Sequence, residues 1–413
     1  MKPTLSKKAI QFKRNISPVR QIMSFADKNY IKKLGLNPKN LISFAGGWVN
    51  HDSPKELIKA YSDIVNDEKL FHESGGYPPT LGESEFKKSV IEFEKHLYGM
   101  NNLKEKNIGV GLGSTQLTTD LLDAILDPND KILLLDPSYC NYPTQIITRL
   151  KNVEIINFNV LDKVSWEYNA DSKLNEFHDF ILKYKPKAIM LVSPDNPTSQ
   201  IPSDKFFQSA LNAVTKIGSF LIVDFAYKEL VFNQDFPKYF SKPPNDNFIA
   251  LRSNSKWCRG LGRRLGWIEA SEQVIESLES LQNSSILCPD MMHQMAFTNY
   301  VKDALKNNTL KDYIIDTNNK YSEAAQKTTS SISKYLDFNY LVPKGGLYTC
   351  INVKEDGGKF VEKILKETGV LFVPGWGFGR SLKEAIRVSF GPLVNNLNLI
   401  DKGFNKVANY IKK

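Results

Sequence analysis

The chain has 413 residues, 41% of them apolar and 11% aromatic, so it can bury a large core and form two or three domains. No stretch approaches the roughly 18 consecutive apolar residues that a membrane-spanning helix needs, which argues against a membrane partner. The formal net charge is +9, but lysines are scattered among acidic residues instead of gathering in one stripe, so we expect no nucleic-acid partner either.

Targeting and metal-binding signals are weak. The N-terminus is basic and has no acidic residue before Asp27, yet it lacks the apolar region of a secretory signal; we expect a cytoplasmic protein, with a transit peptide as the alternative. The four cysteines, at positions 140, 258, 288 and 350, lie far apart without a C-x-x-C pair, and the histidines do not cluster. We therefore expect reduced thiols and no metal site.

Short apolar and β-branched runs recur between about residues 108 and 256, and each ends in a polar or glycine-rich turn. They are 107–115, 131–139, 153–160, 187–197, 219–227 and 248–256. Helical patterns lie between them, such as 116–126 and 204–217, where apolar residues recur every three or four positions. Alternating strands and helices predict an α/β fold: a mainly parallel central sheet with helices on both faces.

The pattern changes after residue 270. Helical segments at 269–285, 290–308 and 321–336 precede two further strands, at 341–353 and 384–391, which a helix at 358–368 separates. These elements predict a smaller α+β domain. We expect a large ligand-binding domain over 46–285 and a small domain formed by both termini, 1–45 and 286–413.

Polar clusters follow the strands of the larger sheet, where ligands of open α/β sheets bind. Gly113, Ser114 and Thr115 stand where a helix begins, so free N–H groups could hold a phosphate there, although an ordinary strand-to-helix turn would look the same. Asn196 lies in a loop stiffened by a proline on either side of Asp195-Asn196, which is also common in plain turns.

Two more strand ends carry ionisable groups. Asp224 follows four apolar residues and needs a cationic partner if it is buried. The alternative for Asp224 is a helix cap or a surface ion pair. Tyr227, three residues further on, can point its phenol to the same place. Lys256 follows Ser253 and Ser255, and cations close by would favour its neutral amine, the form that makes a Schiff base. A solvated lysine is the alternative.

Together these strand ends describe one ligand. A phosphate would meet the serines and Arg264, a cationic ring nitrogen would meet Asp224, a ring hydroxyl would meet Asn196 and Tyr227, and an aldehyde would meet Lys256. Pyridoxal phosphate (PLP) carries all four groups, and a lysine Schiff base with an acidic partner for the pyridinium nitrogen is a signature of that cofactor.

The motifs resemble those of class I and II aminotransferases, which are fold-type I PLP-dependent enzymes, and the resemblance runs from about Ser17 to Gly391. SPDNPTS is similar to the family's N-P-x-N-P-T-G, DFAY to D-x-A-Y, and SNSKWCRGLGRRLGW to S-x-S-K followed by G-x-R-x-G. The resemblance implies a homodimer with shared active sites and an exchange of an amino group between an L-amino acid and a 2-oxo acid.

The resemblance also implies roles for single residues. Catalysis falls to Lys256, Asp224 and Tyr227. The phosphate is assigned to Gly113, Ser114, Thr115, Ser253, Ser255 and Arg264, with Tyr77 reaching across from the other subunit. Tyr139 matches the aromatic residue that stacks on the cofactor ring, and Asn196 the amide beside it. Substrate contacts are assigned to Gly46, Gly47, Asn196 and Arg387, whose guanidinium suits an α-carboxylate.

The chain departs from the motifs at several positions. Ser193 replaces the first Asn and Ser199 the Gly of the proline-flanked motif. Either Arg263 or Arg264 could be the phosphate arginine, and we prefer Arg264 because Leu-Gly-Trp follows it. The bulky Trp48 and Trp376 fall near the expected substrate side chain, so we expect an unusual specificity, for a hydrophobic or lysine-like side chain.

Two alternatives remain open. A lyase, replacement or cyclising enzyme would use the same cofactor and residues, because the motifs indicate the cofactor more specifically than the reaction that it catalyses. A transcription regulator built on an aminotransferase-like domain fits the net charge, but the resemblance starts near Ser17 and leaves no room for a preceding winged-helix segment.

Overall fold

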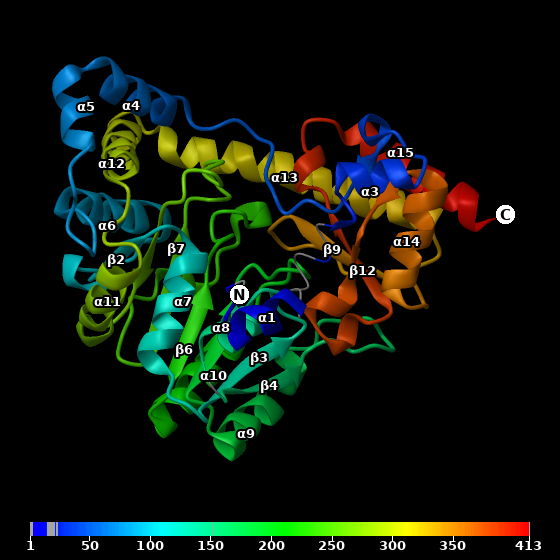
Figure 1. Ribbon diagram of the computed structural model, residues 1–413, viewed down its shortest axis with the longest axis horizontal. Coiled ribbons are helices and arrows are strands. Elements are labelled where there is room, and N and C mark those ends of the chain that lie inside the picture. The colour runs from blue at the N-terminus through cyan, green and yellow to red at the C-terminus, as the bar shows by residue number, and fades with distance from the viewer. Residues whose placement is uncertain (1–2, 15–20, 22–23, 151, 413) are drawn as a thin grey trace.

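The computed structural model describes residues 3–14, 21, 24–150 and 152–412; Ser17, where the motif resemblance was expected to begin, lies outside them. Figure 1 shows a large sheet with its helices joined by the long helix α13 (Thr309–Tyr335) to a smaller part that carries the C-terminus. The assignment of 46–285 and of 1–45 with 286–413 to two domains stays a prediction.

The large sheet has seven strands, and six of them are the runs predicted from the sequence. They are β2 (Ile108–Gly111), β3 (Lys131–Asp136), β4 (Glu154–Asn159), β5 (Ala188–Val192), β6 (Phe220–Asp224), β7 (Phe248–Ser253) and β8 (Gly266–Glu269). Their order is β2-β8-β7-β6-β5-β3-β4, and only β8 runs antiparallel to its neighbours. The sequence analysis missed β8, whose four residues follow directly on an arginine- and glycine-rich loop. The predicted α/β fold with a mainly parallel sheet is confirmed.

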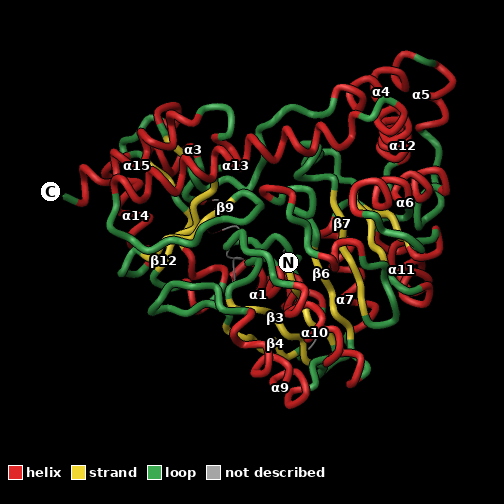
Figure 2. The backbone as a smooth tube through the Cα atoms, turned by 180° about the vertical axis from the view of Figure 1, so that it is seen from behind, coloured by secondary structure: helices red, strands yellow, loops and turns green. Residues whose placement is uncertain are grey.

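Helices cover both faces of this sheet (Figure 2). Alternate residues of one strand point to opposite faces, so in β3 Leu133 packs with α9 (Leu174–Tyr184) and α10 (Asp204–Ile217). Its neighbour Leu134 packs with α7 (Ser114–Ile125), α8 (Tyr142–Arg149) and α11 (Glu272–Ser285). This arrangement leaves the carboxyl ends of the parallel strands free to form a site.

A third helical group packs at the β2 end of the sheet. It comprises α4 (Lys55–Asn66), α5 (Glu68–Ser74), α6 (Ser84–Tyr98) and α12 (Met291–Lys306). Aromatic side chains fill the space between these helices and the sheet: Phe86 and Phe93 of α6 contact Phe297 of α12 and Trp267 of β8.

The smaller part contains a three-stranded antiparallel sheet in the order β11-β12-β9, with β9 (Tyr348–Asn352), β11 (Val373–Pro374) and β12 (Ala385–Ser389). A second, two-stranded sheet pairs β1 (Ile42–Ser43) with β10 (Val370–Leu371). Helices α14 (Gly357–Thr368) and α15 (Leu397–Ile411) contact these strands. Both termini thus contribute strands here, because β1 lies near the start of the chain.

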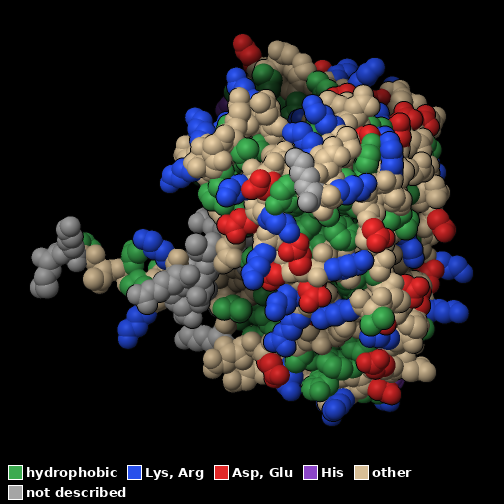
Figure 3. All heavy atoms as spheres, turned by 90° about the vertical axis from the view of Figure 1, so that its right-hand side faces the viewer, with side chains coloured by type: hydrophobic (Ala, Val, Ile, Leu, Met, Phe, Trp, Pro, Cys, Tyr) green, Lys and Arg blue, Asp and Glu red, His purple; other side chains and the backbone are tan. Residues whose placement is uncertain are grey.

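The N-terminal residues divide into two segments. Residues around α3 (Lys28–Lys33) pack against the smaller part, with Tyr30 and Leu36 on its core. Helix α1 (Lys7–Arg14) stands away from the body of the molecule in Figure 3, where basic and acidic side chains are interspersed on the visible face. Within the described ranges, no helix meets the length and apolarity that crossing a bilayer requires, and no three metal-ligating side chains cluster.

Candidate active site

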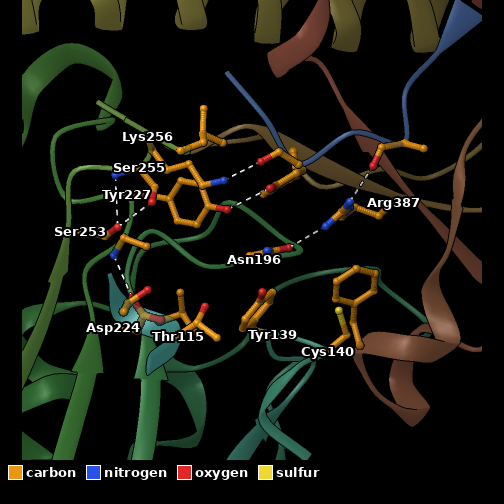
Figure 4. Close-up of a pocket in the computed structure, with 18 of the residues that line it drawn as sticks. Thr115, Tyr139, Cys140, Asn196, Asp224, Tyr227, Ser253, Ser255, Lys256 and Arg387 are labelled. Atoms are coloured by element: carbon orange, nitrogen blue, oxygen red, sulfur yellow. Dashed lines mark hydrogen bonds between the residues drawn. The ribbon is translucent and has the colours of Figure 1, made fainter. Parts of the chain in front are cut away.

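A cavity of about 320 Å³ lies where the carboxyl ends of β5, β6 and β7 meet the smaller part of the molecule (Figure 4). Twelve predicted site residues line it: Gly47, Ser114, Thr115, Tyr139, Asn196, Asp224, Tyr227, Ser253, Ser255, Lys256, Arg264 and Arg387. They come from eight separate stretches of chain. The cavity forms because parallel strands end at one edge and the smaller part closes over that edge.

Lys256 lies just after β7 and points into this cavity. Its Nζ donates to the carbonyl oxygen of Gly47 at 2.5 Å and stands 5.6 Å from the centre of the Tyr227 ring. Burial, helped by the positive charges of Arg387 and Arg264, lowers the pKa of Lys256 to about 8, although Asp224 opposes the shift. A useful fraction of this lysine is therefore a neutral amine near pH 8.

One corner of the cavity is built for an anion. Helix α7 starts at Ser114 after Gly113 (φ 92°), and no side chain caps it. Ser253 Oγ and Ser255 Oγ are 2.9 Å apart, and Arg264 Nη1 lies 3.4 Å from Ser255 Oγ. A helix N-terminus, two hydroxyls and a guanidinium are the donors that a phosphate dianion needs.

Asp224, at the end of β6, is buried at the floor of the cavity. Its carboxylate accepts hydrogen bonds from the Tyr142 hydroxyl at 2.8 Å and from the Ala226 N–H at 3.0 Å. Burial raises the pKa of Asp224 in spite of these two bonds. A cationic group from a ligand would stabilise the carboxylate form, as expected of a buried acid without a contacting cation.

Arg387, on β12, reaches the cavity from the smaller part. Its two terminal nitrogens donate to Asn196 Oδ1 and to the Ala45 carbonyl, each at 3.0 Å. The guanidinium lies between the rings of Tyr348 and Phe378, at 4.3 and 4.8 Å from their centres. Arg387 Nε is buried without a hydrogen-bond acceptor, so the group has capacity left for an anionic ligand.

Three of the predicted residues lie outside the lining of the cavity. Gly113 is adjacent, since a Cβ there would meet Arg264 Nη2 at 2.8 Å. Gly46 is covered by the ring of Trp48, which is itself 44% exposed. Tyr77 is 86% exposed in the loop between α5 and α6 and does not line the cavity.

The departures from the motifs also have defined places. Arg263 turns away from the cavity, with its guanidinium 5.1 Å from the centre of the Tyr61 ring, whereas Arg264 lines the cavity. Ser193 contacts the Tyr239 hydroxyl at 2.6 Å. Ser199 adopts a φ of 55°, the left-handed region that suits the glycine of the motif, and its hydroxyl accepts from the Tyr348 N–H at 3.0 Å.

Several residues with contacts at the site were missed in the sequence, and four of them make contacts that matter for the site. Tyr142, Cys140, Phe378 and Tyr348 hold or line it. Tyr142 and Cys140 stand beside Tyr139 in the stretch DPSYCNY, so helical spacing could have placed Tyr142 near the Tyr139 site. No local signal identifies Tyr348 or Phe378, because both approach from the smaller part.

Comparisons with known proteins agree with this architecture. The family described as "Aminotransferase class I and II" matches residues 39–402. The chain is 25% identical to the (5-formylfuran-3-yl)methyl phosphate transaminase of Methanocaldococcus jannaschii over 99% of this chain and 100% of that enzyme. It is 26% identical to the LL-diaminopimelate aminotransferase of Natranaerobius thermophilus over 88% and 91% of the two chains. The Thermus thermophilus aspartate aminotransferase has the same fold, with a TM-score of 0.83, 18% identity and coverage of 99% and 100%.

The fold is therefore that of the fold-type I α/β enzymes, with the cavity at the carboxyl edge of the sheet. The chain belongs to the class I and II aminotransferase family, whose members use PLP, and it is an aminotransferase.

Proposed function

We propose that the cavity binds PLP and that Lys256 is the residue that holds it. One observation carries the proposal: within a single cavity, a lysine with a lowered pKa, a buried carboxylate and a phosphate-type corner face one another. The residues present fit each group of the cofactor. Arg264, the two serines and the start of α7 fit the phosphate, Asp224 fits a protonated ring nitrogen, and Tyr139 offers a flat ring.

Bound PLP would supply an aldehyde for the lysine and a ring that withdraws electrons from the Cα of the amino acid. The residues of the chain do the rest. Lys256 Nζ, as a neutral amine, can accept the proton from the substrate Cα. Asp224 keeps the ring nitrogen protonated, and the Tyr227 hydroxyl can donate to the ring oxygen. Arg387 orients the substrate by binding its α-carboxylate with two nitrogens.

The lining supports a substrate whose side chain carries no carboxylate. Of the described residues that line the cavity, three are cationic: Lys256, Arg264 and Arg387. Each has a task already, so none remains for a second carboxylate of the substrate. Cys140 and Phe378 offer apolar surface beside Arg387. We propose a hydrophobic or lysine-like amino acid as donor, and a screen in which only aspartate or glutamate reacts would contradict this.

A homodimer with shared sites is part of the proposal, as is a location in the cytoplasm. The exposure of Tyr77 supports the dimer, because a tyrosine that reaches a phosphate of the other subunit has no contact to make within its own protomer.

The first test is an absorbance spectrum of the purified protein mixed with PLP and then with single amino acids. We expect a visible band from the lysine-bound cofactor that the right donor converts to the amine form, with a 2-oxo acid released in equal amount. The band should be lost in Lys256→Ala and kept in Lys302→Ala, a change of an exposed lysine on α12. Release of ammonia without any need for a second oxo acid would favour the lyase instead.

A further inference from the structure

Tyr348 is the residue in the cavity whose contacts the proposed function leaves unexplained. It opens β9, its side chain is only 1% exposed, and it reaches the cavity from the smaller part of the molecule. It contacts a residue assigned to the cofactor and a residue assigned to the substrate, so it can link the two halves of the site.

The first contact is with Tyr227. The two hydroxyl oxygens are 2.9 Å apart, and the rings meet edge to face with centres 5.9 Å apart. A hydroxyl pair of this kind leaves one proton of the two free for a third group. Which tyrosine donates therefore decides whether the Tyr227 proton is available to a ligand.

The second contact favours Tyr348 as the donor of that hydrogen bond. The Arg387 guanidinium carbon lies 4.3 Å from the centre of the Tyr348 ring, and this positive charge makes the Tyr348 hydroxyl the better donor. Burial raises the pKa of both phenols, and Arg387 counters this at both. The bond between the two hydroxyls also counters the rise at Tyr348, whereas Tyr348 adds to the rise at Tyr227 and leaves the pKa of Tyr227 well above its ordinary value. The other ionisable groups near the pair are the Tyr139 phenol, the Cys140 thiol and Lys256.

A third contact holds the main chain of Tyr348. The Tyr348 N–H donates to the hydroxyl of Ser199 at 3.0 Å, and Ser199 stands where the family motif has glycine. The Tyr348 hydroxyl also lies close to Gly47, where an added Cβ would approach it to 3.1 Å. Ser199 and Gly47 thus limit how far Tyr348 can move.

We propose that Tyr348 is a positioning residue: it donates to Tyr227, so that the Tyr227 proton is directed to the ring oxygen of PLP, and it supports Arg387 for the substrate carboxylate. This inference rests on the proposed binding of PLP in the cavity. Because a hydrogen bond received by Tyr227 strengthens the one that it donates, the loss of the Tyr348 hydroxyl weakens the contact of Tyr227 with the ring oxygen. With PLP bound, the Lys256 nitrogen would then keep its proton up to a higher pH.

Tyr348→Phe tests the hydroxyl alone, because the ring under Arg387 stays. The readout is the pH at which the visible band of the bound cofactor titrates, measured without substrate. We expect this midpoint to rise by about 0.5 to 1 pH unit, the size of one hydrogen bond, with KM for the amino acid nearly unchanged. A merely structural role for the hydroxyl would lower thermal stability and leave the midpoint in place.

Tyr348→Leu tests the ring. It removes the support under Arg387, so KM should rise about five- to tenfold in addition to the shift of the midpoint. Ser199→Gly weakens the placement of Tyr348 in another way. It removes the hydroxyl that accepts from the Tyr348 N–H, and glycine adopts the φ of this position without strain. The midpoint should rise as in Tyr348→Phe, but by a smaller amount.

The matched control is Tyr340→Phe, whose hydroxyl bonds Ser333 in the same part of the molecule but outside the cavity. It should leave both midpoint and KM as in the wild type. If the wild type shows a titrating band and Tyr348→Phe coincides with it, the positioning role is wrong while PLP binding stands. If the wild type shows no band at any pH, PLP binding itself fails and the inference with it.

Discussion

The chemistry of this protein depends on how single ionisable groups are buried. Lys256 and Asp224 both lose water in the same cavity, and burial disfavours the charged form of each. Burial therefore favours the neutral amine of Lys256, and it makes the carboxylate of Asp224 dependent on a nearby cation. Bound PLP, as proposed, would satisfy both groups at once, because it offers an aldehyde to the lysine and a ring nitrogen to the aspartate.

The lowered pKa of Lys256 predicts how the apoprotein takes up PLP. The neutral amine is the attacking form, so the uptake rate should rise with pH around a midpoint near 8, as stopped-flow absorbance can measure. In Arg387→Met the midpoint should move upward, because a neighbouring positive charge is lost. A midpoint near the ordinary lysine value of about 10.4 in the wild type would contradict the assignment.

The same shift has a consequence for stability. Between about pH 8 and the ordinary lysine pKa, the unfolded chain keeps a proton that the folded chain has released. The free energy of unfolding of the apoprotein should therefore increase with pH across this window, because the unfolded state binds more protons there. Lys256→Met should abolish this rise in a series of denaturant titrations.

Tyr142 gives a second prediction for a single hydroxyl. Tyr142→Phe removes a hydrogen bond of 2.8 Å to Asp224, so the carboxylate form becomes less favourable and PLP should bind about tenfold more weakly. Tyr335→Phe is a matched control, because its hydroxyl also bonds an aspartate, Asp401, at 2.8 Å but far from the cavity. Equal affinities of the two variants would show that Asp224 needs no help from Tyr142.

At the scale of elements, a buried ionic network joins α6, the end of β7 and the segment that follows β6. Glu94 of α6 accepts from Arg252 at 2.5 and 2.7 Å and from Lys228 at 2.6 Å, and Arg252 also donates to Glu229 at 2.6 Å. All four side chains are fully buried. Arg252 directly precedes Ser253, and Lys228 directly follows Tyr227. Glu94 therefore connects the end of β7 to the loop after β6, and both segments line the cavity.

Glu94→Gln should therefore destabilise the protein strongly. Burial opposes the negative charge, but Arg252 and Lys228 outweigh it and hold the pKa of Glu94 below its ordinary value. Removing that charge takes away the carboxylate that Lys228 contacts and one of the carboxylates around Arg252, and we expect a loss of about 3 to 5 kcal/mol in denaturant titrations. Glu85→Gln, on the same helix but exposed, should change little although Glu85 pairs with Lys88 and Lys302. A small effect in Glu94→Gln would mean that the network is dispensable.

At the scale of the whole molecule, residues of both the larger and the smaller part line the cavity. In the proposed dimer, Tyr77 of the other subunit would add a further contact. If Tyr77 serves the site of the other subunit, a mixture of Lys256→Ala and Tyr77→Ala chains should regain activity. In a hybrid dimer one site then carries both defects and the other site carries none.

The control mixture is Lys256→Ala with Asp224→Asn, two changes of the same site. Each site of that hybrid keeps one defect, so no activity should return. Sedimentation of the wild type gives the oligomeric state independently. A monomer, or equal recovery in both mixtures, would contradict the sharing of sites.

The amino-acid sequence by itself determined the strands of the large sheet, apart from β8, and the polar residues of the cavity at the strand ends. It could do so because apolar periodicity is local, and because polar residues at the carboxyl ends of parallel strands must meet at one edge. Lys256, Asp224 and Asn196 were predictable for that reason. Gly47, Tyr139 and Arg387 were expected only from the resemblance of the motifs to the family.

Only the tertiary structure decided the rest. The short strand β8 depends on pairing with β2 and β7 rather than on its own four residues. Tyr348 and Phe378 reach the cavity because the smaller part packs on the larger, so no spacing along the chain reveals them. The choice of Arg264 over Arg263 is a matter of side-chain direction, which is set by the packed loop and its positive φ at Arg264. Local patterns reflect which groups a strand end carries, whereas packing between distant segments decides which of those groups face each other.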